Sequence, residues 1–335
     1  MSQSSVILSG FADEAANQKT LDQQFSALAA LGMRYFSIRF VDAGKGVKNV
    51  MGLEPDELEI VQRKIDEYGL NVSSLGSPIG KVKLCDVEDG TSTPFQPFDR
   101  YIAEDVPRAC ELANAFGSKL IRGFSFYHPK GSSIEDHFEQ ARDQVGKIAE
   151  VCDSHGLTYG LEVEANLIGQ NGELLARMHR DINSDALVLI FDGGNLVTMG
   201  YSADKVFEQY ELMKPGLGWL HIKDFLNPQS GIVDHVDEEA LKHFVPADIG
   251  DSGHERIFAD LADFLPELES RMVTRGVPGV FLDLEPHVKG GGQFGGFSGP
   301  DGFGVALRAL CRICDKAGIG YQLREFADIQ KDRGF

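Results

Sequence analysis

Four polar residues in the second half of the chain each stand at the end of a short apolar run. The runs LEVE, LIFD, WLH and LDLE end at Glu164, Asp192, His221 and Glu285. If these side chains meet at one point, the three carboxylates repel one another unless they are protonated or neutralised by a cation. The residue types therefore predict a site for one divalent metal ion.

This ligand set also predicts the kind of metal. Oxygen ligands with one nitrogen and no thiolate favour a hard to borderline ion, so Mn2+ is the predicted metal, with Mg2+, Co2+ and Zn2+ left open. The alternative is that each acid caps the helix after it. Two glutamates, which are poor caps, and a histidine in the series argue against this alternative.

Further polar residues are expected near the same site. The candidates for substrate binding are Arg39, His128, Lys223 and His254. Lys223 follows His221 closely, and the alternative for it is an ion pair with a neighbouring carboxylate. Other polar residues expected near this rim are Asp13, Glu14, Ser77, Lys81, Asp224 and His287.

The elements that would position these residues alternate along the chain. The apolar runs typical of strands are VILSG, YFSIRF, NVSSLG, KLIRGFSF, LTYGLEVE, ALVLIFD, GWLHIKD and GVFLDLE, and segments with helical spacing of apolar residues separate them. Eight such alternations predict an α/β fold, a single-domain (β/α)8 TIM barrel of parallel strands. Glycines 32, 69, 117 and 156 precede strands and are expected to end helices. Because polar residues at the carboxyl ends of barrel strands lie on the catalytic face, the four predicted ligands should converge.

Two long connections and a tail modify this plan. The segment from Phe225 to Glu255 and the glycine-rich GGGQFGGFSGPDGFG from Gly290 follow strands seven and eight, so both are expected on the catalytic face. The barrel is predicted to span residues 1–318. Residues 319–335 form a C-terminal extension that packs outside the barrel or against a partner subunit, so a homo-oligomer remains open.

Composition excludes several classes of function. The 335 residues carry a net charge of −19, which disfavours nucleic acid and anionic membranes as partners. Nothing resembles a signal peptide, and no stretch approaches the ~20 apolar residues of a membrane helix. Five cysteines without paired spacing fit a reducing cytoplasm. The pair Cys311 and Cys314 lies in an apolar-periodic segment, which favours a helix over a zinc site.

The order of short motifs resembles a known superfamily. The stretches are GFADEA, YFSIRF, LGSPIGKV, LEVEAN, FDGGN, LHIKD, VPADIGDSG and LEPHVKGGGQFGGFSGPDGFGVA. Together they are similar to the xylose isomerase-like barrel superfamily, in particular its sugar phosphate isomerase/epimerase branch. The resemblance implies that Glu, Asp, His and Glu from the last four strands hold the metal, which corresponds to Glu164, Asp192, His221 and Glu285. Asn166 and Asn195 stand where many members have histidine.

The resemblance implies a metal-dependent enzyme that acts on a small carbohydrate. The expected function is isomerisation or epimerisation of a ketose or keto-sugar, phosphorylated or not, through an enediolate with Glu164 and Glu285 as the catalytic acid and base. A carboxylate has two oxygens, so each glutamate could both bind the metal and exchange a proton. The same enolate would serve a keto-sugar or keto-glycoside lyase or dehydratase, which is the main alternative. An endonuclease IV-like nuclease is disfavoured because its three-metal cluster needs more histidines. A non-catalytic sugar-binding barrel would be expected to lack one of the paired glutamates, and both are present.

Overall fold

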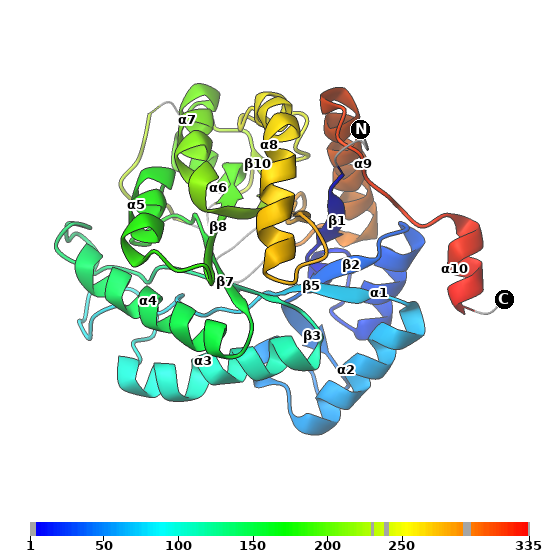
Figure 1. Ribbon diagram of the computed structural model, residues 1–335, viewed down its shortest axis with the longest axis horizontal. Helices are drawn as coiled ribbons and strands as arrows, with labels where there is room; N and C mark the ends of the chain where they lie inside the picture. Colours follow the sequence, from blue (N-terminus) through cyan, green and yellow to red (C-terminus); the bar gives the residue numbers. More distant parts are fainter. Residues whose placement is uncertain (1–4, 229–230, 238–240, 291–295, 334–335) are drawn as a thin grey trace.

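Eight parallel strands form a barrel at the centre of the molecule (Figure 1). The computed structural model describes residues 5–228, 231–237, 241–290 and 296–333. In spatial order the strands are β1 (Ile7–Gly10), β12 (Phe281–Leu284), β9 (Leu217–Ile222), β8 (Leu187–Asp192), β7 (Thr158–Glu162), β6 (Leu120–Gly123), β5 (Asn71–Leu75) and β2 (Tyr35–Ile38). A parallel bridge between Phe11 and Ser37 joins the ends of this sheet. The predicted (β/α)8 barrel and all eight predicted strands are confirmed.

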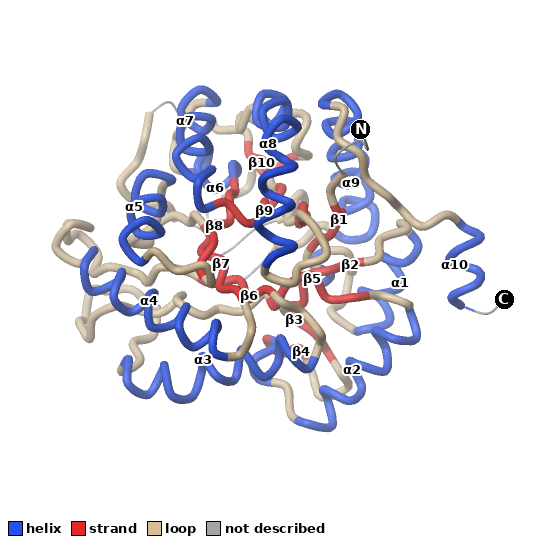
Figure 2. The backbone as a smooth tube through the Cα atoms, viewed as in Figure 1, coloured by secondary structure: helices blue, strands red, loops and turns tan. Residues whose placement is uncertain are grey.

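Helices surround the strands (Figure 2). They are α1 (Leu21–Ala30), α2 (Pro55–Tyr68), α3 (Phe98–Ala115), α4 (Phe138–Ser154), α5 (Gly172–Ile182), α6 (Gly193–Thr198), α7 (Ala203–Met213), α8 (His254–Thr274), α9 (Gly299–Ala317) and α10 (Phe326–Arg333). Short 3-10 helices span Ala12–Glu14, Val50–Gly52 and Lys214–Gly216. Two small hairpins pair β3 (Phe40–Asp42) with β4 (Val47–Asn49) and β10 (Asp224–Phe225) with β11 (Phe244–Val245).

Helix α2 shows how local sequence sets these boundaries. Glu54 and Glu57 form a capping box at its start, and Pro55 occupies the first turn, where a missing N–H is tolerated. Gly69 ends the helix with φ +60°, a conformation that glycine adopts without strain. Positive φ at residues 32, 117 and 156 confirms the same expectation for the other three predicted glycines.

Strand register brings the polar strand ends to one level of the barrel. Asp192 of β8 is paired with His221 of β9, and His221 is paired with Asp283 of β12. Since neighbouring residues in register point to the same side of a sheet, these side chains share the barrel interior. Ser9 of β1 is in register with Asp283, and Ser73 hydrogen-bonds Ser9 at 2.7 Å and Asp283 at 3.3 Å, so the interior carries a buried polar layer.

The long connections and the C-terminal segment adopt defined structure where they are described. The connection after β9 includes the β10–β11 hairpin. In the glycine-rich connection after β12, residues 291–295 lie outside the described part of the chain, and Phe297 N donates to Gly290 O at 2.8 Å. Arg324 Nη2 donates to Met33 O at 2.9 Å, so the segment after α9 packs on the loop that precedes β2.

Two further features concern helices. Cys311 and Cys314 lie within α9, which confirms the helical prediction for that segment. Among the described residues, no helix has the length and apolar character needed to cross a membrane.

Candidate metal centre

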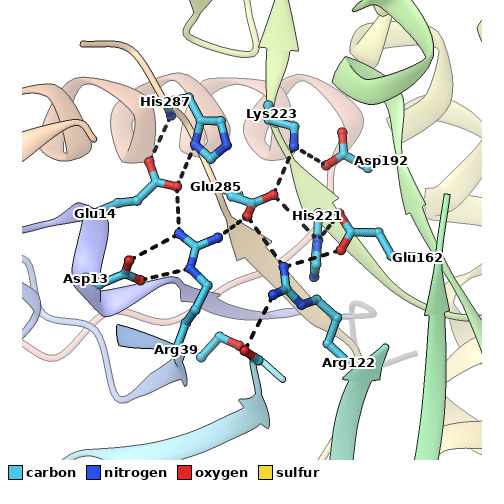
Figure 3. A network of polar contacts seen from close by, with 12 residues as sticks. Asp13, Glu14, Arg39, Arg122, Glu162, Asp192, His221, Lys223, Glu285 and His287 are labelled. Carbon is cyan, nitrogen blue, oxygen red and sulfur yellow. Dashed lines mark hydrogen bonds and ion pairs between the residues drawn. The ribbon is translucent and has the colours of Figure 1, made fainter. Parts of the chain in front are cut away.

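Four buried side chains gather at the carboxyl ends of consecutive barrel strands. They are Glu162, Asp192, His221 and Glu285, and their ligand atoms all lie within 4.8 Å of one another. Glu162 ends β7, Asp192 ends β8, His221 lies in β9 and Glu285 directly follows β12. Figure 3 shows these side chains directed toward one another. Three carboxylates and one imidazole therefore lie close together at the ends of these strands.

The first glutamate of this group differs from the sequence expectation, which named Glu164. Strand β7 ends at Glu162, whose side chain is 1% exposed. Glu164 comes two residues later, is 13% exposed and forms an ion pair with Lys81 at 3.1 Å. Residues two apart point to the same side of a strand, so the alternating pattern alone does not distinguish them. Glu162, one alternation earlier and the last residue of β7, lies in the group of four, and the metal-binding role of either glutamate stays a prediction.

The crowding of acids makes this group suited to a divalent cation. His221 Nδ1 lies 3.0 Å from Glu162 Oε1 and 3.9 Å from Glu285 Oε2. Burial raises the pKa of Asp192 to about 7, and the charges of Glu162 and Glu285 act in the same direction against the opposing charge of Lys223. Asp192 Oδ2 is buried and accepts no well-aligned hydrogen bond. Oxygen donors with one imidazole nitrogen fit a hard to borderline ion, which would hold all four groups in their metal-binding protonation states.

The two glutamates of the group are held in their ionised forms. Burial alone would raise the pKa of Glu162, but His221 lowers it to about 2. Burial opposes ionisation of Glu285 too, yet Lys223, His287 and Arg39 hold the pKa of Glu285 well below its ordinary value. Both carboxylates are therefore available as ligands or as proton acceptors at neutral pH.

Three basic side chains contact these carboxylates. Lys223 Nζ lies 3.0 Å from Glu285 Oε2 and 3.1 Å from Asp192 Oδ2. Burial would lower the pKa of Lys223, but the neighbouring carboxylates raise it well above its ordinary value, so the amine stays protonated. Arg39 Nη1 donates to Glu285 Oε1 at 2.6 Å. Arg122 Nη1 lies 3.4 Å from Glu162 Oε2.

Arg39 and Lys223 were candidates from the sequence, whereas Arg122 was not. Arg122 lies in the apolar run of β6, where a single basic residue between apolar neighbours was the available signal. Its guanidinium also lies 5.0 Å from the ring of Phe11, and the Arg39 guanidinium lies 4.3 Å from the same ring. Phe11 thus contacts both arginines through cation–π interactions.

The other two candidates for substrate binding lie apart from this group. His254 begins α8, and its Nε2–H donates to the Lys223 carbonyl at 3.1 Å, so it contacts the backbone of Lys223. His128 lies in the loop after β6, with Nδ1 3.3 Å from Ser132 Oγ, and burial lowers its pKa. Within the described residues, no hydrogen bond or ion pair joins either histidine to the four clustered side chains.

A second acidic group adjoins the first. Glu14 Oε1 lies 2.7 Å from His287 Nδ1, and His287 N donates to Glu14 Oε2 at 2.9 Å. These contacts hold His287 at φ +51°, a conformation that non-glycine residues rarely adopt. Arg39 lies 3.4 Å from Glu14 and already supplies positive charge between it and Glu285. Glu14 therefore pairs with Arg39, and His287 contributes positive charge near Glu285.

Comparisons with known proteins identify relatives of this fold. The sequence model of the xylose isomerase-like TIM barrel family matches residues 25–287. A xylose isomerase domain protein from Planctomyces limnophilus has a TM-score of 0.64 at 15% identity, covering 95% of this chain and 99% of that chain. A xylose isomerase-like TIM barrel protein from Mycobacterium smegmatis in complex with magnesium gives 0.60 at 18% identity, covering 93% and 96%.

A third similar structure contains a sugar. It is the D-allulose 3-epimerase from Methylomonas sp. in complex with D-allulose, with a TM-score of 0.60 at 14% identity, covering 92% of this chain and 97% of that chain. Identities this low show a shared fold. No curated protein matches the chain in sequence.

Proposed function

The chain belongs to the xylose isomerase-like TIM barrel family, and from that premise we propose that it is a divalent-metal-dependent sugar isomerase or epimerase. The substrate class is a ketose or keto-sugar, free or phosphorylated. The observation that carries the proposal is the meeting of Glu162, Asp192, His221 and Glu285 at the mouth of the barrel, with every ligand atom within 4.8 Å of the others.

These four residues are the proposed metal ligands, with Mn2+ as the proposed ion. The relative from Mycobacterium smegmatis was solved with magnesium, which is also a hard divalent cation. A bound divalent ion would polarise the substrate carbonyl and stabilise the negative charge of an enediolate. Glu162 replaces Glu164 in this proposal because Glu162 lies in the group and Glu164 pairs with Lys81.

Glu162 and Glu285 are the proposed acid and base. They come from β7 and from the end of β12, with β9 and β8 between these strands, so the two carboxylates approach the site from different sides. Both are ionised at neutral pH, and a bound divalent ion would acidify the carbon beside a carbonyl enough for a carboxylate to remove its proton. Removal by one glutamate and return by the other, on the opposite face, inverts the carbon. Return to the neighbouring carbon, with the hydroxyl proton passing between the two adjacent oxygens, interconverts an aldose and a ketose.

Lys223 and Arg39 have supporting tasks in this scheme. The protonated Lys223 amine, 3.0 Å from Glu285, is placed to donate a hydrogen bond to a substrate oxygen as negative charge develops there. Arg39 fixes the orientation of the Glu285 carboxylate through its 2.6 Å hydrogen bond. A fixed carboxylate reaches the transition state with less loss of conformational freedom.

The test combines metal analysis with proton exchange. Protein purified without chelator and supplied with Mn2+ is incubated in D2O with ketoses, keto-sugars and their phosphates, and deuterium incorporation is followed by NMR. We expect one bound metal per chain and exchange beside the carbonyl of at least one substrate, with exchange abolished in Glu285→Gln.

The product then identifies the reaction. An epimer or an aldose/ketose isomer supports the proposal, whereas loss of a group from the β carbon would replace it with a lyase or dehydratase. A chain that binds no divalent metal under these conditions would contradict the proposed site.

A further inference from the structure

A pocket of about 860 Å3, lined by both polar and apolar side chains, lies at the face of the barrel that carries the metal centre. Its walls come from the loops after β5, β6 and β7 and from residues 234–237. Its described lining does not include the four clustered side chains. Its volume falls in the range of small-molecule sites, about 300–1,000 Å3.

Side-chain to backbone hydrogen bonds fix two walls of this pocket. Asp89, in the loop after β5, forms an ion pair with Lys83 at 2.7 Å and accepts a hydrogen bond from Lys130 N at 3.2 Å. The Lys130 contact ties the loop after β5 to the loop after β6. These walls are therefore set by interactions within the protein.

The opposite wall is fixed by Asn166. Its side chain donates to Val236 O at 2.9 Å and accepts from Val236 N at 2.9 Å, which joins the loop after β7 to residues 234–237. Asn166 has φ +66°, a costly conformation that the paired hydrogen bonds help to maintain. A pocket whose walls are held in this way loses little freedom when a ligand binds.

The chemistry of the lining suits a neutral polyhydroxylated group. Ser132, Gln170 and His128 supply hydrogen-bonding groups, while Tyr127 and Ile134 supply apolar surface for the C–H faces of a sugar ring. The acids Asp234 and Asp237 also line the pocket together with Lys130. A phosphate would meet these carboxylates and gain no excess of positive charge.

The pocket lies within reach of the reacting centre. Asn166 follows Glu162 by four residues, and a chain of four residues spans at most about 14 Å. We propose that this pocket is a subsite for a neutral glycosyl group attached to the reacting sugar, so that the substrate is a keto-sugar glycoside rather than a free monosaccharide. This inference rests on the proposed function for the identity of the reacting sugar. It also assigns a role to His128, which lines this pocket and does not contact the four clustered side chains.

The experiment measures binding in the absence of metal. The full chain in EDTA is titrated with maltose, cellobiose, lactose and trehalose, with glucose and glucose 6-phosphate as comparators, and saturation-transfer NMR reports contact. We expect at least one disaccharide to bind more tightly than glucose. His128→Ala and Gln170→Ala should each weaken that disaccharide about tenfold, the effect of losing one or two hydrogen bonds.

The matched control is His155→Ala, because His155 is exposed after α4, at the opposite end of the barrel. It should bind the disaccharide as the unmodified protein does. Failure of every disaccharide to exceed glucose, tighter binding of glucose 6-phosphate, or equal losses in His128→Ala and His155→Ala would each overturn the subsite. Metal binding is measured separately on the same preparations, so disaccharide binding without metal binding would contradict the proposed function and leave the subsite intact.

Discussion

Arg39 and Glu285 are joined by a 2.6 Å hydrogen bond from Nη1 to Oε1, which connects the residue after β2 to the residue after β12. Arg39 also lies 3.3 Å from Asp13 and 3.4 Å from Glu14, both near the end of β1. The guanidinium is buried and neutralises part of the acidic charge at the barrel mouth. It therefore serves both the stability of the barrel and the position of a proposed metal ligand.

Replacement of Arg39 by methionine should destabilise the protein. The change leaves buried carboxylates without their cation, and loss of one partner from a buried ion pair costs about 3–5 kcal/mol. Urea denaturation of the metal-free protein measures the free energy of unfolding. Arg180→Met is the control, because Arg180 is 72% exposed and its replacement should change stability by less than about 0.5 kcal/mol. Equal stability of the two variants would show that Arg39 is not needed to balance the acids.

Glu162 and Glu164 form a matched pair for testing the metal centre. Glu162→Gln removes a charged oxygen donor from the group of four, and should lower the affinity for Mn2+ by at least about 100-fold, since even outer-shell changes cost 10–100-fold. Glu164→Gln removes a charge that pairs with Lys81 and leaves the group of four intact, so it should change the affinity by less than about threefold. Calorimetric titration with Mn2+ gives both values. A larger loss in Glu164→Gln than in Glu162→Gln would restore the ligand expected from the sequence.

The fold was predictable because its signals are repeated and local. Eight apolar runs alternate with helical segments, and glycines such as Gly69 mark helix ends through their positive φ. The side chains at the ends of β8, β9 and β12 followed from the same pattern. The choice between Glu162 and Glu164 did not, because alternation assigns both to one face, and only the end of the hydrogen-bonded strand separates them.

The contact of Arg122 with the clustered acids could not be predicted from the alternating sequence pattern either. Arg122 reaches Glu162 across the β6–β7 pair, a contact that depends on the tilt and register of the strands in the barrel. His254 and His128 show the converse: both were expected at the site from connections on the catalytic face, yet one contacts the backbone of Lys223 and the other lines the pocket formed by the loops after β5, β6 and β7. The position of a residue along the chain predicted the face of the barrel on which it lies. The direction in which its side chain points could be seen only in the folded structure.

Gly160 provides a test of packing inside the barrel. A Cβ at this position would lie 2.0 Å from Cη2 of Trp219, so Gly160→Ala forces the buried indole to move. Overpacking of this kind costs about 1–3 kcal/mol. Gly146→Ala is the control: it lies within α4, its Cβ would meet nothing closer than 3.8 Å, and it should stabilise by about 0.5–1 kcal/mol. Thermal unfolding of both variants should shift the midpoint in opposite directions, and a shift of the same sign would contradict the packing argument.

The raised pKa of Asp192 predicts how the stability of the metal-free protein depends on pH. Burial raises this pKa from 3.8 to about 7. Between these values the folded protein keeps a proton that the unfolded chain has released, so the contribution of Asp192 to stability falls as pH rises from about 4 to about 7. Asp192→Asn has no ionisable group at this position, so its stability should not show this decrease. Glu162, whose pKa is lowered to about 2, acts in a different window and loses its contribution as pH falls below about 4.5.

The measurement is the free energy of unfolding in EDTA at pH values from 4 to 8, for the unmodified protein and for Asp192→Asn. We expect the variant to gain stability relative to the unmodified protein across this interval and to reach a plateau above about pH 7. Addition of Mn2+ should stabilise the unmodified protein most above pH 7, where Asp192 is ionised and able to bind metal, and should leave Asp192→Asn nearly unchanged. A difference between the two proteins that stays constant from pH 4 to pH 8 would mean that Asp192 ionises with its ordinary pKa, and that neither its burial nor the neighbouring carboxylates disfavour its charge in the folded protein.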